Sequence, residues 1–155
     1  GQRVLLPASG FGCEEVREGP FVITHRNRLF LTYSACDTGK PDYKVGTLWT
    51  TVDQDPMDPE SWSQVAEPIL SRADSNGVFG PGHHSFFKSP DDSEDWIAYH
   101  GKTTSEYTYH GRTTRVQRVE WTDEGMIQPI VPLSLGTPIS LPSGDPKSRR
   151  SEITE

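Results

Sequence analysis

The histidines of this sequence are candidate metal ligands. His83, His84, His100 and His110 all lie in the second half of the chain. Zinc needs three or four His, Cys or carboxylate ligands, and its sites carry them at recognisable intervals. No such spacing links these histidines, so the sequence does not predict a zinc site.

Carboxylates gather in an acidic run formed by Asp53, Asp55, Asp58 and Glu60. Such a run could suggest a calcium loop, but it lacks the spaced ligands, the glycine and the closing glutamate of that motif. Two prolines also interrupt it. We therefore interpret the run as a solvated turn.

Aromatic side chains offer a third kind of chemistry, because the apolar face of a sugar ring stacks on them. The sequence contains six Phe, five Tyr and four Trp. Most of them fall within apolar runs, and we expect these, including Trp49 and Trp62, to belong to the core.

The elements that position these residues are predicted to be β-strands. Fourteen glycines and 13 prolines interrupt the chain too often for long helices. Short β-favouring runs recur instead, and two pairs of them are predicted to form hairpins, 21–24 with 29–33 and 85–88 with 96–100. The other runs are 43–51, 115–121 and 126–131. An all-β sandwich, barrel or propeller is therefore expected.

Length and charge narrow the functional class. Lys and Arg number 15 against 22 Asp and Glu, a net charge of −7 that argues against a nucleic-acid partner. The sequence contains no apolar stretch of about 20 residues, so it does not predict a membrane-spanning helix.

The hydrophobic fraction of 32% is low for a stand-alone globule, and the sequence opens Gly1-Gln2-Arg3 without Met or a signal peptide. We therefore expect a piece of a larger fold.

The two cysteines leave two alternatives open. Cys13 and Cys36 could pair in a secreted protein. The bridge would close a loop of about 23 residues and stabilise the fold by ~3 kcal/mol. Two buried free thiols are the other alternative.

Six sequence blocks carry a resemblance to a known family. In order they are Glu18-Gly19-Pro20-Phe21, RNRLFLTYSA from Arg26 to Ala35, Tyr43-Lys44-Val45-Gly46, Gly80-Pro81-Gly82-His83-His84-Ser85, Asp95-Trp96-Ile97-Ala98-Tyr99-His100 and Gly111-Arg112-Thr113-Thr114-Arg115-Val116-Gln117. Over about residues 14–135 this set resembles the C-terminal half of glycoside hydrolase family 43. The resemblance implies a five-bladed β-propeller. Residues 1–136 would supply about three of its blades, at roughly 40–50 residues each, and residues 137–155 a polar tail or closing segment.

The resemblance also implies inverting glycoside hydrolysis, which needs a general acid and a second carboxylate as base. Glu18 matches the family's acid, whose pKa must be raised for that role. The family's base and pKa-tuning aspartates lie upstream of this motif, yet the first 17 residues contain no Asp. We therefore expect the N-terminal blades on a second chain, with a truncated fragment as the alternative.

Three further residues are implied to line the sugar site. His83 matches a histidine on the pocket floor, near the propeller axis and often close to a calcium ion, so a structural calcium is compatible with it. Arg112 matches a substrate-binding arginine, whose planar donors suit sugar hydroxyls. Phe79, just before the Gly-Pro-Gly-His block, is the best aromatic candidate. His84 has no family role and is placed at the pocket rim.

The function implied is release of terminal α-L-arabinofuranosyl units from plant arabinan or arabinoxylan by a secreted enzyme that requires no cofactor for its chemistry. Residues 109–117 look most like the arabinofuranosidase branch of the family. A β-xylosidase of the same family stays open as an alternative. So does a sugar-binding propeller that has lost its base.

Overall fold

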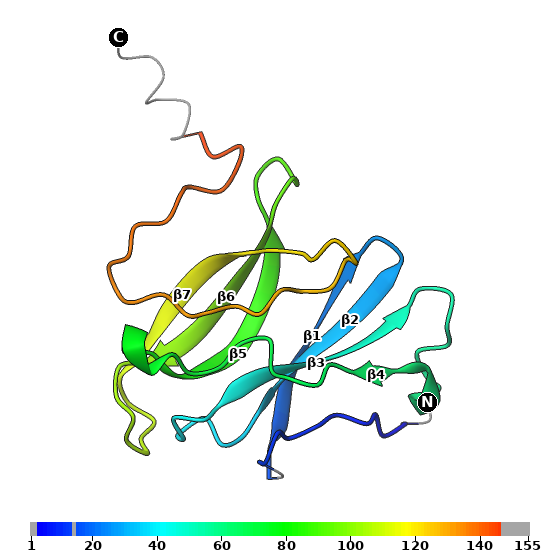
Figure 1. Ribbon diagram of the computed structural model, residues 1–155, viewed down its shortest axis with the longest axis horizontal. Coiled ribbons are helices and arrows are strands. Elements are labelled where there is room, and N and C mark those ends of the chain that lie inside the picture. The colour runs from blue at the N-terminus through cyan, green and yellow to red at the C-terminus, as the bar shows by residue number, and fades with distance from the viewer. Residues whose placement is uncertain (1–2, 14, 147–155) are drawn as a thin grey trace.

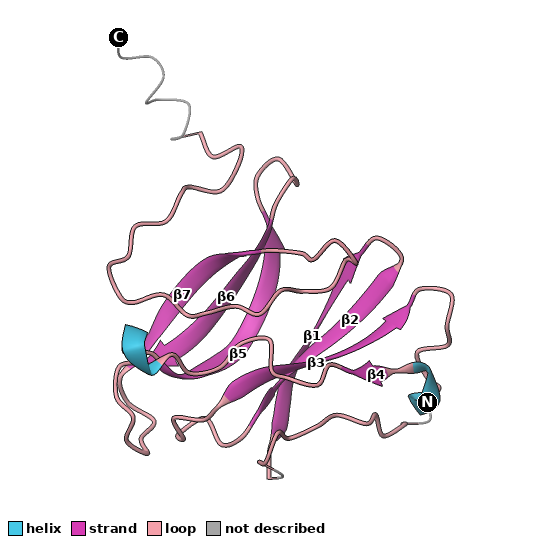
Figure 2. Ribbon diagram, viewed as in Figure 1, coloured by secondary structure: helices cyan, strands magenta, loops and turns pink. Residues whose placement is uncertain are grey.

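Two antiparallel β-sheets form the structure, a computed structural model that describes residues 3–13 and 15–146 (Figure 1). The first sheet has the order β1-β2-β3-β4, with β1 (Arg17–His25), β2 (Arg28–Ala35), β3 (Lys44–Thr51) and β4 (Ser63–Gln64). The second has the order β5-β6-β7, with β5 (Phe79–Lys88), β6 (Asp95–Lys102) and β7 (Arg112–Val119). Helix in the described residues is limited to two short 3-10 turns, η1 (Pro59–Ser61) and η2 (Asp74–Asn76) (Figure 2).

The main core lies between the two sheets. Side chains alternate between the faces of a strand, so every second residue of β2 and β6 points into this layer. Its buried members are Ile23, Phe30, Val45, Ile69, Leu70, Phe86, Ile97, Tyr99, Val119, Ile127 and Ile130. The other face of β2 carries Tyr33 and Ala35 into a smaller core, covered by Leu6, Ala8 and Phe11 of the N-terminal segment.

Most of the predicted strands are confirmed, including both hairpins. The first hairpin turns at Arg26, whose φ of +52° lets β1 and β2 pair directly. The run 126–131 is a correction, because it forms only isolated bridges, from Ile127 to Trp121 and from Ile130 to Leu70. Two prolines within 129–132 remove backbone donors there. The described residues thus make two sheets, and long connections take up the remaining length.

The acidic run 53–60 is a turn, as predicted: Asp53, Asp55 and Asp58 are exposed, and Asp58 caps η1 by accepting from the backbone N–H of Glu60 at 3.0 Å. Trp62 is buried and Trp49 packs against the core, which confirms both predictions. Within the described residues, no helix is long and apolar enough to cross a membrane.

The predicted tail begins at residue 137, and its last nine residues lie outside the described part of the chain. Residues 137–146 contain no strand or helix. They contact the β5–β6 turn, where the Ser143 hydroxyl donates to Asp91 and its backbone N–H to Glu94 at 3.0 Å.

Candidate active site

Glu18 lies near the start of β1, where the strand departs from regular pairing. It is opposite Ser34 of β2, and the register shifts between Glu18 and Phe21. Gly19, within this irregularity, has a φ of +56°, a left-handed conformation that glycine adopts without steric cost. Bulges of this kind re-aim a side chain. The Glu18 side chain remains 39% exposed, so its carboxyl group can reach a ligand.

The Glu18 carboxylate accepts a hydrogen bond from the Tyr43 hydroxyl, with 2.7 Å between the oxygens. Tyr43 ends the β2–β3 connection and is fully buried. Burial, and then its hydrogen bond to Glu18, raise the pKa of Tyr43 well above its ordinary value. The phenol therefore stays protonated and acts as a donor. Tyr43 begins one of the blocks that carry the family resemblance, but sequence analysis assigned it no role in the site, because nothing in its local pattern distinguishes it from a strand residue.

His83 completes a cluster with these two residues. Its Nδ1 lies 3.9 Å from Glu18 Oε1 and 3.4 Å from the Tyr43 hydroxyl oxygen. The backbone has a φ of +48° at His83, and its N–H donates to Ser34 Oγ at 2.8 Å. The ring is 62% exposed. The structure thus brings together two of the predicted site residues, Glu18 and His83, from different sheets.

The Gly80-Pro81-Gly82 block explains how β5 can approach the β2–β3 connection so closely. A Cβ atom on Gly82 would lie 2.3 Å from Tyr43 Cε1. One on Gly80 would lie 2.6 Å from the Lys40 carbonyl oxygen, and Gly80 also has a φ of +53°. Glycine is therefore required here because the β2–β3 connection crosses directly over β5.

His100 of β6, which sequence analysis considered only as a zinc ligand, also lies beside this cluster. Its ring stacks on Tyr43 at 5.5 Å between centroids and 10° between planes. Its Nε2 lies 3.3 Å from Thr38 Oγ1. Burial, then the nearby Arg112 charge, lower the pKa of His100 to about 4, so the ring is neutral and uncharged beside Tyr43 at neutral pH.

Arg112 begins β7 and is exposed. Its Nε donates to the Tyr109 carbonyl at 3.0 Å. Its positive charge contributes to lowering the pKa of His100 and partly offsets the increase in the pKa of Tyr43. The guanidinium group therefore lies within electrostatic range of the cluster. Substrate binding by Arg112 stays a prediction.

The loop before Arg112 is fastened to the β2–β3 connection. The Lys102 ammonium group donates to the carbonyls of Gly39 and Glu106. The Tyr107 hydroxyl donates to Asp37 at 3.0 Å. Both sheets therefore contribute loops to the end of the molecule at which β1 begins, at the bottom of Figure 1.

Phe79 has a different environment from that cluster. Its ring lies 5.2 Å from the Arg72 guanidinium carbon, and Arg72 is itself paired with Asp42 and Asp74. One face of the ring is thus covered by a cation. Its role in sugar binding stays a prediction.

His84 is not at the pocket rim, which corrects that expectation. It follows His83 on β5 and points to the opposite face, where it is only 6% exposed. Its Nε2 lies 2.6 Å from Thr32 Oγ1, and burial lowers its pKa to about 4. His84 is a core histidine.

The described residues do not complete a metal site. The described residues contain no group of three or more His, Cys, Asp or Glu side chains able to hold an ion. Calcium takes six to eight oxygen ligands, whereas this cluster offers one carboxylate, one hydroxyl and an imidazole. These residues do not fit a calcium ion by themselves, and no chemical step is derived through one.

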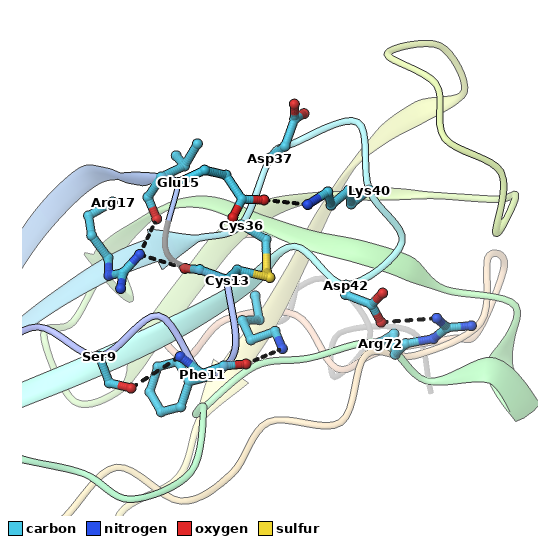
Figure 3. The surroundings of a disulfide bond; sticks show 12 residues. Ser9, Phe11, Cys13, Glu15, Arg17, Cys36, Asp37, Lys40, Asp42 and Arg72 are labelled. Carbon is cyan, nitrogen blue, oxygen red and sulfur yellow. Dashed lines mark hydrogen bonds and ion pairs between the residues drawn. A yellow bond between two sulfur atoms is a disulfide. The ribbon is translucent and has the colours of Figure 1, made fainter.

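A disulfide anchors the segment that leads into Glu18. Cys13 is bonded to Cys36, 23 residues later, directly after β2 (Figure 3). The Arg17 guanidinium donates to the Cys13 carbonyl at 2.7 Å, and Lys40 pairs with Glu15 alongside. The pairing alternative for the two cysteines is therefore confirmed, and the bridge restrains the chain just before the candidate acid.

Curated relatives match most of this chain but much less of their own length. The chain is 33% identical over 135 residues to an extracellular exo-alpha-(1->5)-L-arabinofuranosidase of Streptomyces avermitilis, covering 83% of this chain and 28% of that protein. It is 35% identical over 133 residues to alpha-L-arabinofuranosidase 43 of Humicola insolens, covering 82% and 27%.

Solved structures agree with these matches. An alpha-L-arabinofuranosidase from Lactobacillus brevis superposes with a TM-score of 0.72 at 35% identity, over 77% of this chain and 38% of that one. A thermostable family-43 glycoside hydrolase gives 0.69 at 34%, over 81% and 38%. The model of the glycosyl hydrolases family 43 matches residues 4–127. The chain therefore belongs to glycosyl hydrolases family 43 and forms part of that family's five-bladed β-propeller.

Proposed function

We propose that the protein carrying this chain is an inverting glycoside hydrolase that releases terminal α-L-arabinofuranosyl units from plant arabinan or arabinoxylan. Glu18 is the general acid in this proposal. The observation that carries it is the position of the Glu18 carboxyl group, held at a sheet edge by Tyr43 at 2.7 Å yet partly open to solvent. Two curated relatives of known name, at 33% and 35% identity, are arabinofuranosidases.

Inverting hydrolysis requires a general acid and a general base on separate residues. The acid protonates the leaving oxygen while a second carboxylate, roughly 6.5–9.5 Å away, activates water on the opposite face of the sugar. Glu18 supplies the first role. The base, and the residue that keeps the acid protonated, belong to blades that precede this part of the fold, on a partner chain or another segment. A structural calcium, if bound near His83, would draw its remaining ligands from those blades.

We expect the substrate to contact polar groups around the Glu18 cluster. His83 is largely exposed beside the carboxylate, and the Arg112 guanidinium presents further donors. These suit the hydroxyls of a pentose, and Phe79 would stack on the sugar or on the next unit of the chain. A secreted location agrees with the names of two relatives, which are called extracellular, and with the Cys13–Cys36 disulfide, since such bonds persist in oxidising compartments.

Hydrolysis of p-nitrophenyl α-L-arabinofuranoside and of arabinan by the intact protein tests this function. Glu18→Gln removes the proton donor, and we expect kcat on arabinan to fall about 10²- to 10⁴-fold. Glu15→Gln is the matched control, because Glu15 is an exposed glutamate that pairs with Lys40. We expect that variant to keep its activity.

Three results distinguish the alternatives. Proton NMR of the first product should show the β anomer, and release of the α anomer would contradict inversion. Faster turnover of the β-xyloside than of the arabinofuranoside would reassign the protein as a β-xylosidase. Sugar binding by calorimetry with no turnover of either would make it a sugar-binding propeller.

A further inference from the structure

The Tyr43 hydroxyl group lies between the two exposed side chains of the site. Its oxygen is 2.7 Å from Glu18 Oε1 and 3.4 Å from His83 Nδ1. A phenol has one hydrogen to donate, and a carboxylate oxygen can only accept. The hydrogen therefore goes to Glu18, and the phenol oxygen is left as an acceptor toward its other two neighbours, the Ser34 hydroxyl group and His83.

This arrangement determines the hydrogen on each neighbour. When Glu18 is protonated, Oε1 is already occupied by the Tyr43 donor, so the acid proton resides on Oε2. Toward His83 the phenol oxygen can only accept, so a hydrogen bond between the two groups requires the hydrogen on Nδ1 of the imidazole. In a neutral ring the other nitrogen, Nε2, then has a free lone pair.

The Tyr43 side chain is held too firmly to adopt another arrangement. It is fully buried, its ring stacks on His100, and the absence of a Cβ on Gly82 lets the ring rest against the β5 backbone. Ser34, which faces Glu18 in the register of β1 and β2, also fixes the His83 backbone through its hydroxyl.

We propose that Tyr43 is a positioning residue that, through one hydroxyl group, directs the Glu18 proton onto Oε2 and holds His83 as the Nδ1–H tautomer. Oε2 then faces the leaving oxygen, and the lone pair of His83 Nε2 stays available to a ligand. In the chemical step, the proton passes from Oε2 to the leaving oxygen as the glycosidic bond breaks, and the resulting carboxylate keeps its hydrogen bond from Tyr43. The catalytic part of this inference rests on the proposed function, whereas the tautomer of His83 does not.

Tyr43→Phe removes the hydroxyl and keeps the ring that packs against Gly82 and His100. A hydrogen bond to a charged group is worth a factor of about 10 to 100. We expect kcat to fall by about that factor on arabinofuranosides with poor leaving groups, with little change in KM. The loss should be smaller on p-nitrophenyl arabinofuranoside, whose leaving group needs little protonation.

Tyr33→Phe is the matched control. Tyr33 is also a buried tyrosine of the first sheet, but its hydroxyl lies within hydrogen-bond distance of the Ser9 carbonyl and Gln64 Oε1, on the face away from the main core. The ratio of its kcat to that of the wild type should be the same for good and poor leaving groups. Equal kcat values for Tyr43→Phe and the wild type on poor leaving groups would overturn the catalytic part of the proposal.

Nitrogen-15 NMR of the histidine rings gives a test that does not depend on activity. At a pH well above the ordinary imidazole pKa of about 6.5, wild-type His83 should show hydrogen on Nδ1, with its signal assigned by loss in His83→Gln. Tyr43→Phe should shift that ring toward the Nε2–H form. An Nε2–H tautomer in the wild type would refute the inference. A wild type that cleaves no arabinofuranoside would refute the proposed function instead, and the NMR result would still decide the role of Tyr43.

Discussion

The buried histidine of β5 makes the stability of this protein depend on pH. His84 is only 6% exposed, its Nε2 lies near Thr32 Oγ1, and its Nδ1 has no hydrogen-bond partner. Its ring meets Phe86 edge-on at 5.4 Å. Nothing here compensates a positive charge, and burial accordingly lowers the pKa of His84 to about 4.

The direction and size of this pH dependence follow from the linkage between protonation of His84 and folding. The unfolded chain protonates His84 near pH 6.5, whereas the folded protein resists protonation until about pH 4. Above pH 6.5 the residue has no influence on the free energy of unfolding. Between pH 6.5 and 4 the unfolded state binds more protons, so stability falls with falling pH. The loss attributable to His84 is about 2 kcal/mol at pH 5 and approaches about 3 kcal/mol below pH 4.

Urea unfolding of the intact protein at pH 7 and pH 5 measures this loss. In His84→Gln the titrating group is gone, so the wild type should lose about 2 kcal/mol more than the variant between the two pH values. His100 is present in both proteins, and its contribution cancels in the difference. His110→Gln, at an exposed position, should lose as much as the wild type. Equal pH dependence of His84→Gln and the wild type would show that His84 accepts a proton in the fold.

Two other substitutions test the packing around the site. Gly82→Ala places a methyl group 2.3 Å from Tyr43 Cε1; we expect a loss of about 1–3 kcal/mol in the free energy of unfolding together with reduced kcat, and unchanged thermal unfolding would contradict this close contact. Replacing both Cys13 and Cys36 by Ser opens a 23-residue loop and should cost about 3 kcal/mol; denaturant unfolding with and without reductant measures it, and a wild type insensitive to reductant would argue against the bridge.

Much of the fold could be predicted from local sequence. The β-favouring runs 21–24 and 29–33 lie on either side of a short polar turn, and they form the β1–β2 hairpin. The same holds for 85–88 and 96–100 in the second sheet. The run 126–131 misled for a definable reason: apolar composition predicted a strand, but prolines at 129 and 132 prevent a continuous ladder.

The candidate site was only partly predictable. Glu18, His83 and Arg112 lie in distinctive glycine-containing blocks, and the structure places the first two in contact range. His84 shares its block with His83, yet strand alternation sends it into the core. Which of two adjacent histidines faces the site depends on the register of β5, and a shift of one residue would exchange them.

By itself, the sequence determined which segments form most of the strands, where the chain must turn, and which blocks resemble glycoside hydrolase family 43, because these depend on neighbouring residues. Only the tertiary structure decided that Tyr43 meets Glu18, 25 residues earlier, and His83, 40 residues later. It likewise decided that Cys13 pairs with Cys36. Such contacts depend on how two sheets pack and which connection crosses which strand, and no local propensity encodes that geometry.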